Sequence, residues 1–166
     1  MNYADYKRFD VLNGRGLRHS LFVSGCSHQC SMCFNREAWD SNFGEQFTKE
    51  IENKIIADLQ KEKPYIQGLS ILGGEPFENL DGLFPLVERV RKECPEKDIW
   101  IWSGYTYEQI IKDENKLKLL TMCDMLIDGK YIHKLRDLTL KWRGSSNQRV
   151  IDIRRSLQHG KLNISE

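Results

Sequence analysis

The feature that most constrains this chain is a short apolar run that ends at a glycine-containing turn, and it occurs four times. Short apolar runs bounded by glycine are typical of buried strands. Between these runs, apolar residues recur at helical spacing. Strands that alternate with helices form βαβ units, so we predict an α/β fold with a mostly parallel sheet. The four predicted strands are residues 20–23, 69–72, 99–102 and 125–127.

Four helices and a weaker fifth strand complete the expected pattern. Thr48 and Asn79 are suitable N-cap residues for two helices, because each precedes an apolar stripe at helical spacing. Two more helices are expected near residues 107–111 and 116–123, and a strand over residues 149–153.

The length of the chain limits how far such a sheet can close. A closed eight-stranded barrel needs at least about 200 residues, and this chain has 166. We therefore predict an incomplete, open β/α barrel with a curved sheet. Residues 1–166 are expected to form a single domain, with a short polar tail from about residue 156.

Composition and charge narrow the range of partners. The net charge is +1, which predicts neither a nucleic-acid nor a membrane surface. No apolar run resembles a signal peptide or a membrane span, so we expect a cytoplasmic protein. Cys94 and Cys123 stand alone and are interpreted as ordinary packing thiols.

An unusual loop follows each of the four predicted strands. In parallel α/β folds these loops gather at one edge of the sheet, where ligands bind. We therefore expect the four loops to converge on a single site. They are the cysteine loop that starts at Cys26, Gly73–Pro76, Ser103–Thr106 and Asp128–Lys130.

The cysteine loop has the spacing Cys26-x-x-x-Cys30-x-x-Cys33. A [4Fe–4S] cluster normally takes four cysteines, so three leave one iron open to another ligand. The alternative is a zinc site in which His28 is the fourth ligand. Four ligands so close in sequence would strain a tetrahedral site, because structural zinc sites use separated pairs. For His28 we favour a structural role or a hydrogen bond to a cluster sulfur.

Several motifs together resemble a known family. The cysteine spacing is the signature of the radical S-adenosylmethionine enzymes, and the string from Ser24 to Asn35 resembles their smallest members, the activases of glycyl-radical enzymes. Within these, the chain is similar to the activases of anaerobic (class III) ribonucleotide reductase. Met32 is a mild departure, since an aromatic residue is usual there. The other supporting stretches are Asn13–Gly16, Gly73–Pro76, Trp102–Thr106, Asp124–Lys130 and Arg143–Arg149.

The resemblance implies a radical oxidoreductase with one [4Fe–4S] cluster, held by Cys26, Cys30 and Cys33, and with S-adenosylmethionine as its second cofactor. Reductive cleavage of S-adenosylmethionine would give a 5′-deoxyadenosyl radical that takes a hydrogen atom from a backbone glycine of the reductase. A one-electron donor such as flavodoxin or ferredoxin would reduce the cluster. The protein would supply orientation and electrostatics, while the cofactors carry the chemistry.

The resemblance also implies which residues contact S-adenosylmethionine. The backbones of Met32, Cys33 and Phe34 would meet the adenine, although core packing is the alternative for Phe34. Gly73 and Gly74 would allow a close approach to the methionine amino group.

Four further residues complete this set of expected contacts. Glu75 would either accept a hydrogen bond from that amino group or hold its own loop. Lys130 would pair with the carboxylate, with Asp128 orienting the lysine or binding a cation, unless the two are a surface pair. Ser103 would bind the ribose or the methionyl end.

Two other functions stay open at this point. The first is the activation of a different glycyl-radical enzyme. The second is a non-catalytic, cysteine-rich metal-binding module that serves in protein interactions.

Overall fold

A computed structural model describes residues 1–165, and its centre is a sheet of four neighbouring parallel strands. These confirm the four strands predicted from the apolar runs. Their side chains are almost entirely buried, as expected for strands covered on both faces. The strands are β2 (Arg18–Val23), β4 (Gly68–Gly73), β5 (Asp98–Trp102) and β6 (Met125–Asp128).

Antiparallel strands border this parallel centre on both sides. β1 (Asn2–Asp10) pairs with β2, β3 (Glu45–Gln46) pairs with β1, and β7 (Arg149–Asp152) pairs with β6. The sheet order is β3-β1-β2-β4-β5-β6-β7, and the sheet is not closed. The fold is thus mixed α/β with an open seven-stranded sheet. β1 was not predicted because its side chains are mostly polar and half-buried or exposed.

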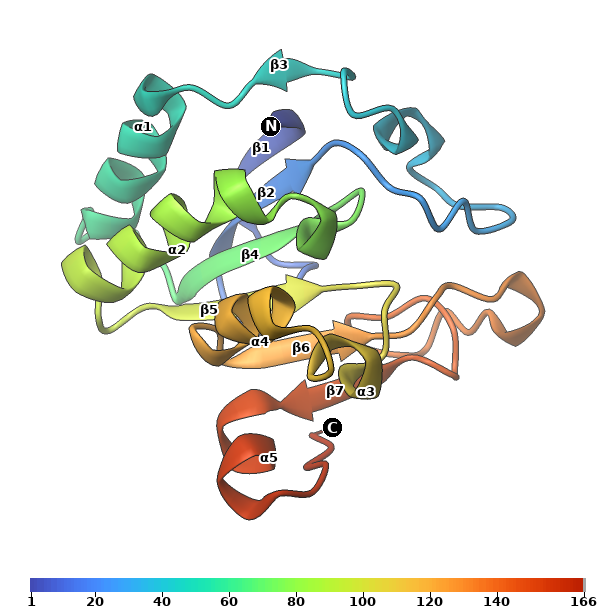
Figure 1. Ribbon diagram of the computed structural model, residues 1–166. Helices are drawn as coiled ribbons and strands as arrows, with labels where there is room; N and C mark the ends of the chain where they lie inside the picture. The colour runs from blue at the N-terminus through green and yellow to red at the C-terminus, as the bar shows by residue number, and fades with distance from the viewer. Residues whose placement is uncertain (166) are drawn as a thin grey trace.

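Helices cover one face of the sheet (Figure 1). Their apolar stripes pack against a core that includes Leu21, Ile71, Ile101 and Leu126, all fully buried. A last helix follows β7. The helices are α1 (Lys49–Gln60), α2 (Leu80–Glu93), α3 (Tyr107–Ile110), α4 (Glu114–Thr121) and α5 (Ile153–His159), with short 3-10 turns at Arg36–Trp39, Pro76–Glu78 and His133–Leu135.

The two expected N-cap residues occupy the cap positions of α1 and α2, but neither side chain bonds to its helix. The Asn79 amide instead donates to the backbone carbonyls of Ser24 and Glu75, at 3.0 Å each. Asn79 therefore ties the loop after β4 to the end of β2.

The opposite face of the sheet carries a smaller apolar cluster of Trp100, Ile127 and Val150, against which Trp142 packs. Beside it lies a set of buried or half-buried polar residues near the amino ends of the parallel strands. We call this set the Arg18 network. Its members are Asp10, Asn13, Arg18, Ser20, Ser70 and Asp98.

Arg18 is fully buried at the centre of this network. Its guanidinium pairs with Asp98 at 2.6 Å and donates to the Ser70 hydroxyl at 2.7 Å. Ser70 in turn donates to the carbonyl of Asn13. The network therefore holds the loop between β1 and β2 against the sheet.

The segment expected to be a polar tail begins inside α5. Ser156 is buried, and its hydroxyl donates to the carbonyl of Asp152 and accepts from the N–H of Asn163. Ile164 forms a bridge with Ile151, so the segment folds back on β7.

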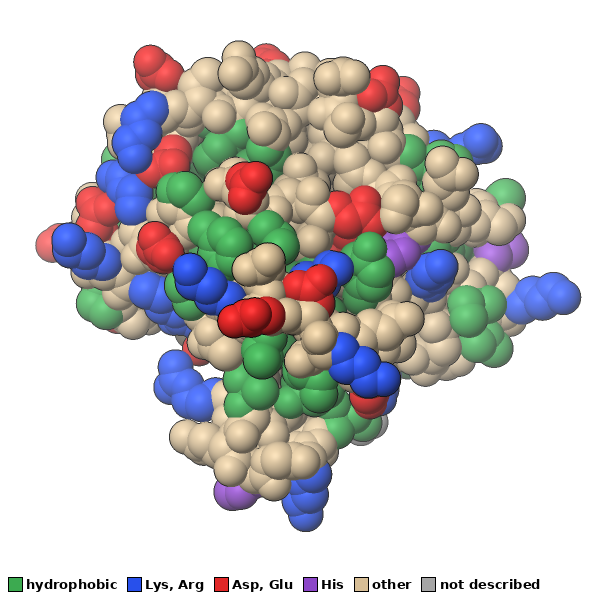
Figure 2. All heavy atoms as spheres, in the orientation of Figure 1, with side chains coloured by type: hydrophobic (Ala, Val, Ile, Leu, Met, Phe, Trp, Pro, Cys, Tyr) green, Lys and Arg blue, Asp and Glu red, His purple; other side chains and the backbone are tan. Residues whose placement is uncertain are grey.

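Basic and acidic side chains are interspersed over the helical face of the molecule (Figure 2), in keeping with its small net charge. Within residues 1–165, no helix is long and apolar enough to cross a membrane.

Candidate functional site

The cysteine loop leaves the carboxyl end of β2 and lies at the edge of the sheet where all four parallel strands end (Figure 1). The N–H of Gly25 bonds to the carbonyl of Ala38 at 2.7 Å, which closes the base of the loop. Gln29 and Met32 have positive φ angles of 49° and 61° and turn the chain back on itself. This local geometry keeps three cysteines together on one short segment.

All three cysteines of the loop are free and partly exposed. Burial raises the pKa of the Cys26 thiol to about 11, while the backbone N–H groups of His28 and Gln29 act against that rise. Burial also raises the pKa of Cys30, and the N–H of Tyr131 acts against it. These thiols are protonated at neutral pH, so binding iron must release their protons.

The donor set suits a cluster better than a single ion. A cubane cluster places each thiolate on a different iron, so its ligands are spread around the cube. The zinc alternative needs its four ligands around one position. In the described part of the chain, no three His, Cys, Asp or Glu side chains gather closely enough for that. His28 turns its Nε2 toward Glu75, at 2.7 Å.

A cavity of about 720 Å³ opens beside the cysteine loop. Cys30 and Cys33 line one side, and Leu72 and Trp102 form its floor at the ends of β4 and β5. The segment between β6 and β7 contributes most of the remaining lining. The residues it contributes are Tyr131, His133, Arg136, Asp137, Leu138, Leu140, Trp142, Arg143, Gly144 and Gln148.

Met32 and Phe34 also line this cavity, and their side chains are 65% and 87% exposed. Phe34 is therefore not a core residue, which removes the packing alternative for it. Leu12, from the loop that the Arg18 network holds, lines the cavity from another side and is 74% exposed. The mouth of the cavity thus has an apolar rim.

Gly73 and Gly74 make close contacts with the protein itself. A Cβ on Gly73 would lie 2.5 Å from the backbone nitrogen of Val23, and Gly73 has a φ of 117°. A Cβ on Gly74 would lie 2.5 Å from the carbonyl oxygen of Gly25. Both glycines let the end of β4 pack directly against β2 and the base of the cysteine loop.

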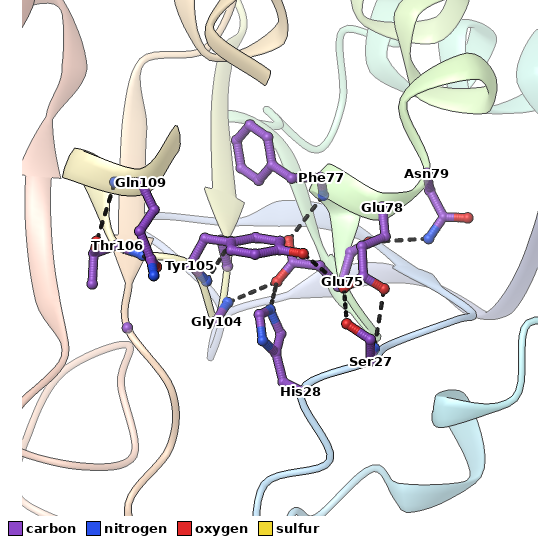
Figure 3. A network of polar contacts seen from close by, with 12 residues as sticks. Ser27, His28, Glu75, Phe77, Glu78, Asn79, Gly104, Tyr105, Thr106 and Gln109 are labelled. Atoms are coloured by element: carbon purple, nitrogen blue, oxygen red, sulfur yellow. Dashed lines mark hydrogen bonds and ion pairs between the residues drawn. The ribbon is translucent and has the colours of Figure 1, made fainter. Parts of the chain in front are cut away.

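Glu75 is fully buried and holds loops together, the second of its two expected roles. Its carboxylate accepts from the N–H of Phe77 and from the Ser103 hydroxyl, at 2.9 Å each. It also accepts from the N–H of Gly104 at 2.8 Å and faces His28 (Figure 3). The Ser103 hydroxyl therefore donates its hydrogen bond to Glu75.

Asp128 and Lys130 make different contacts and do not pair with each other. Asp128 is buried, pairs with Arg149 and accepts from the N–H of Tyr107 at 2.7 Å. Its carboxylate thus orients Arg149 and the start of α3. Lys130 is exposed and lines a second hollow of about 420 Å³, and its positive charge acts against the burial that raises the pKa of Cys30.

Ser27, Glu78 and Tyr105 were missed by the sequence reasoning. Glu78 accepts from the N–H and the hydroxyl of Ser27, and from the Tyr105 hydroxyl at 3.0 Å. Burial, helped by Glu78, raises the pKa of Tyr105 to about 12, so its hydroxyl stays a donor. The available signal was that Glu75 and Glu78 lie three positions apart, immediately after a glycine turn.

Comparison with known proteins agrees with this arrangement. Residues 12–151 match the family model described as a 4Fe-4S single cluster domain. Proteins named anaerobic ribonucleoside-triphosphate reductase-activating protein are similar over nearly their whole length. The one from Vibrio cholerae serotype O1 is 48% identical over 150 residues, which is 89% of this chain and 96% of that protein.

Two proteins of the same name from other organisms are slightly less similar to this chain. The protein from Escherichia coli is 43% identical over 156 residues, 93% of this chain and all of its own length. The protein from Enterobacteria phage T4 is 42% identical over 152 residues, 90% of this chain and 93% of its own length. With its free cysteines on one loop beside a cavity, the chain belongs to the family of anaerobic ribonucleoside-triphosphate reductase-activating proteins.

Proposed function

We propose that this protein activates an anaerobic ribonucleoside-triphosphate reductase by generating a glycyl radical on it. The observation that carries the proposal is a loop of three free thiols at the carboxyl edge of a parallel sheet, two of which line a cavity of about 720 Å³. When bound, a [4Fe–4S] cluster supplies the electron that cleaves S-adenosylmethionine to a 5′-deoxyadenosyl radical. The names of the relatives support the choice of partner.

The residues proposed to hold the cluster are Cys26, Cys30 and Cys33. The backbone N–H groups of His28 and Gln29 act against the raised pKa of Cys26, and that of Tyr131 acts against the raised pKa of Cys30. Hydrogen bonds to cluster sulfurs adjust the reduction potential, so these amides would adjust this one.

S-adenosylmethionine would bind between the cysteine loop and the turns after β4 and β5. Met32 and Phe34, on the cavity wall, would present their backbones to the adenine. Lys130, exposed in the second hollow, would pair with the carboxylate as a point charge. Gly73 and Gly74 would keep the backbone of the β4 turn close to the methionine amino group.

We also propose that the open sheet is an incomplete barrel of the radical S-adenosylmethionine type, with the cavity on its inner face. Trp102 and Leu72 support this, since they line the cavity from the ends of two parallel strands. All five cysteines are free, which suits a reducing compartment such as the cytoplasm, where flavodoxin or ferredoxin would donate the electron.

The function is tested by anaerobic reconstitution followed by iron and sulfide analysis. The reduced protein should convert S-adenosylmethionine to 5′-deoxyadenosine and methionine. Addition of the reductase should then give a glycyl-radical signal in electron paramagnetic resonance. A radical on a lyase-type partner but none on the reductase would point to a different glycyl-radical enzyme. One zinc per chain and no sulfide would indicate a non-catalytic module instead.

A further inference from the structure

We propose that His28 is a positioning residue, which, clamped between Glu75 and the backbone of Gly104, fixes the cysteine loop at a set distance from the turn after β5. The inference rests on the proposed function, because it assigns the geometry of that same site. We call the contact set of Ser27, His28, Glu75, Glu78, Gly104 and Tyr105 the loop clamp (Figure 3).

The first observation is that the Glu75 carboxylate is saturated. One oxygen accepts from Phe77 and Ser103, and the other from Gly104 and His28, at 2.7–2.9 Å. The side chain is fully buried. A carboxylate with this many donors has no open side for a ligand ammonium. Glu75 therefore acts on a cofactor only through the loops that it joins.

The second observation is that Glu78 repeats this connection a few ångströms away. It accepts from Ser27 of the cysteine loop and from Tyr105 of the β5 turn. The Tyr105 ring also meets the His28 ring edge-on, with centroids 4.5 Å apart. Glu75, which caps the 3-10 turn Pro76–Glu78, and Glu78 at its end thus join the same pair of loops twice.

The third observation concerns Gly104. A Cβ there would lie 2.4 Å from Cδ2 and 2.7 Å from Nε2 of the His28 ring. The φ angle of Gly104 is not in the left-handed region, so the backbone itself does not require glycine. The missing side chain is needed because the His28 ring packs directly on the backbone at this point.

These contacts have a consequence for the chemistry. The cluster ligands lie on the cysteine loop, and the turns after β4 and β5 face them. S-adenosylmethionine must be held by both sides at once. A displacement of about 1 Å at a reacting centre costs up to about a hundredfold in rate. A side chain that sets the spacing of these two sides therefore controls the rate without contacting the substrate.

The test is a double-mutant cycle with Gly104→Ala, His28→Ala and the combined variant, all reconstituted with iron and sulfide. The alanine methyl pushes the ring out of the clamp, whereas it has free space once the ring is gone. We expect each single variant to retain its iron and to cleave S-adenosylmethionine about tenfold more slowly, with a raised KM. The combined variant should be no slower than His28→Ala.

Two further variants separate positioning from a general loss of stability. His28→Gln places an amide N–H where Nε2 lies, so it should recover most of the rate. Gly82→Ala, in α2, is the matched control, since the nearest atom to its Cβ would be Cβ of Met1, at 2.6 Å, and not an atom of the loop clamp. It should cleave S-adenosylmethionine at the wild-type rate.

Hydrogen exchange in the cluster-free full chain gives a readout that needs no cofactor. The amides of Ser27 and Gly104 donate to Glu78 and Glu75, so both should exchange at least tenfold faster in Gly104→Ala and His28→Ala. Unchanged exchange and cleavage in Gly104→Ala, or rate losses that simply multiply in the combined variant, would overturn the positioning role. Failure of the wild-type protein to cleave S-adenosylmethionine would instead overturn the proposed function, while the exchange result still decides the clamp.

Discussion

Two polar networks, each built around one fully buried charged side chain, lie at opposite ends of the same parallel strands. The Arg18 network sits at the amino ends and fastens the loop between β1 and β2 to the sheet. The loop clamp sits at the carboxyl ends and joins separate loops to one another. Similar chemistry thus has different consequences, because in parallel α/β folds the carboxyl ends carry the reaction and the amino ends carry stability.

The largest effect is expected from a substitution in the cysteine loop, at the carboxyl ends of the strands. Cys30→Ala should lose the [4Fe–4S] cluster and all cleavage of S-adenosylmethionine, because the remaining two thiols cannot hold the cube. Iron analysis and product assays measure this. Cys94→Ala, at a fully buried cysteine, is the control and should retain its iron. Full iron content in Cys30→Ala would remove this residue from the ligand set.

Arg18→Met disrupts the Arg18 network at the amino ends of the strands. It removes a fully buried guanidinium that pairs with Asp98 and donates to Ser70. Loss of one member of a buried pair destabilises by about 3–5 kcal/mol, although Asp98 is partly exposed and brings the expectation to the lower end. Urea unfolding of the cluster-free chain measures the change. A loss below about 1 kcal/mol would show that the network is not a major source of stability.

Asp10→Asn tests how the stability contributed by the Arg18 network depends on pH. Burial raises the pKa of Asp10, but hydrogen bonds from Asn13, Leu12 and Ser20 outweigh it and leave the pKa lowered. The ionised form therefore stabilises the fold above about pH 4, and this contribution disappears as the pH falls through the lowered pKa.

The expected loss in Asp10→Asn is about 1.5 kcal/mol at pH 7, and it should shrink as the pH falls through the lowered pKa of Asp10. Urea unfolding at several pH values measures it. Asp5→Asn, exposed on the same strand, is the control. A difference that stays constant from pH 7 to pH 3 would contradict the role of the ionised carboxylate.

The smallest effect is expected outside both networks. Arg154 pairs with Asp124 at 3.2 Å, but its side chain is 71% exposed. Exposed ion pairs contribute little, so Arg154→Ala should change the free energy of unfolding by less than about 0.5 kcal/mol. Thermal or urea unfolding measures this baseline. A loss comparable to that of Arg18→Met would mean that burial does not determine how much an ion pair contributes to stability.

The sequence predicted the parallel centre because those strands are continuous apolar runs with glycine at their ends. It did not predict β1, β3 or α5. β1 carries mostly polar residues, and its pairing depends on β2, which lies beyond a loop in the sequence. β1 lies between β3 and β2 in the sheet, and a polar strand of this kind obtains its register from its neighbours rather than from its own composition.

The cysteines proposed as ligands could be identified from the sequence because spacing within one loop is a local property. The loop clamp was not, since Ser27, Glu78 and Tyr105 become neighbours only when three separate loops meet. Glu75 was predicted to contact the cofactor or to hold its own loop, and Ser103 to contact the cofactor; in the structure the Ser103 hydroxyl donates to Glu75 at 2.9 Å. The sequence pattern indicated which loops come together, whereas the hydrogen bonds between those loops depend on tertiary contacts.

The wall formed between β6 and β7 has a consequence for the order of synthesis. The cysteines leave the ribosome early, whereas Tyr131, Trp142 and Gln148 emerge near the end of the chain. β7 must then pair with β6, and Arg149 must reach Asp128, before that wall is fixed. Because chains emerge N-terminus first, the nascent protein carries three uncovered thiols through most of its translation. Iron could therefore reach these thiols over a long period of synthesis, and oxygen could oxidise them over the same period.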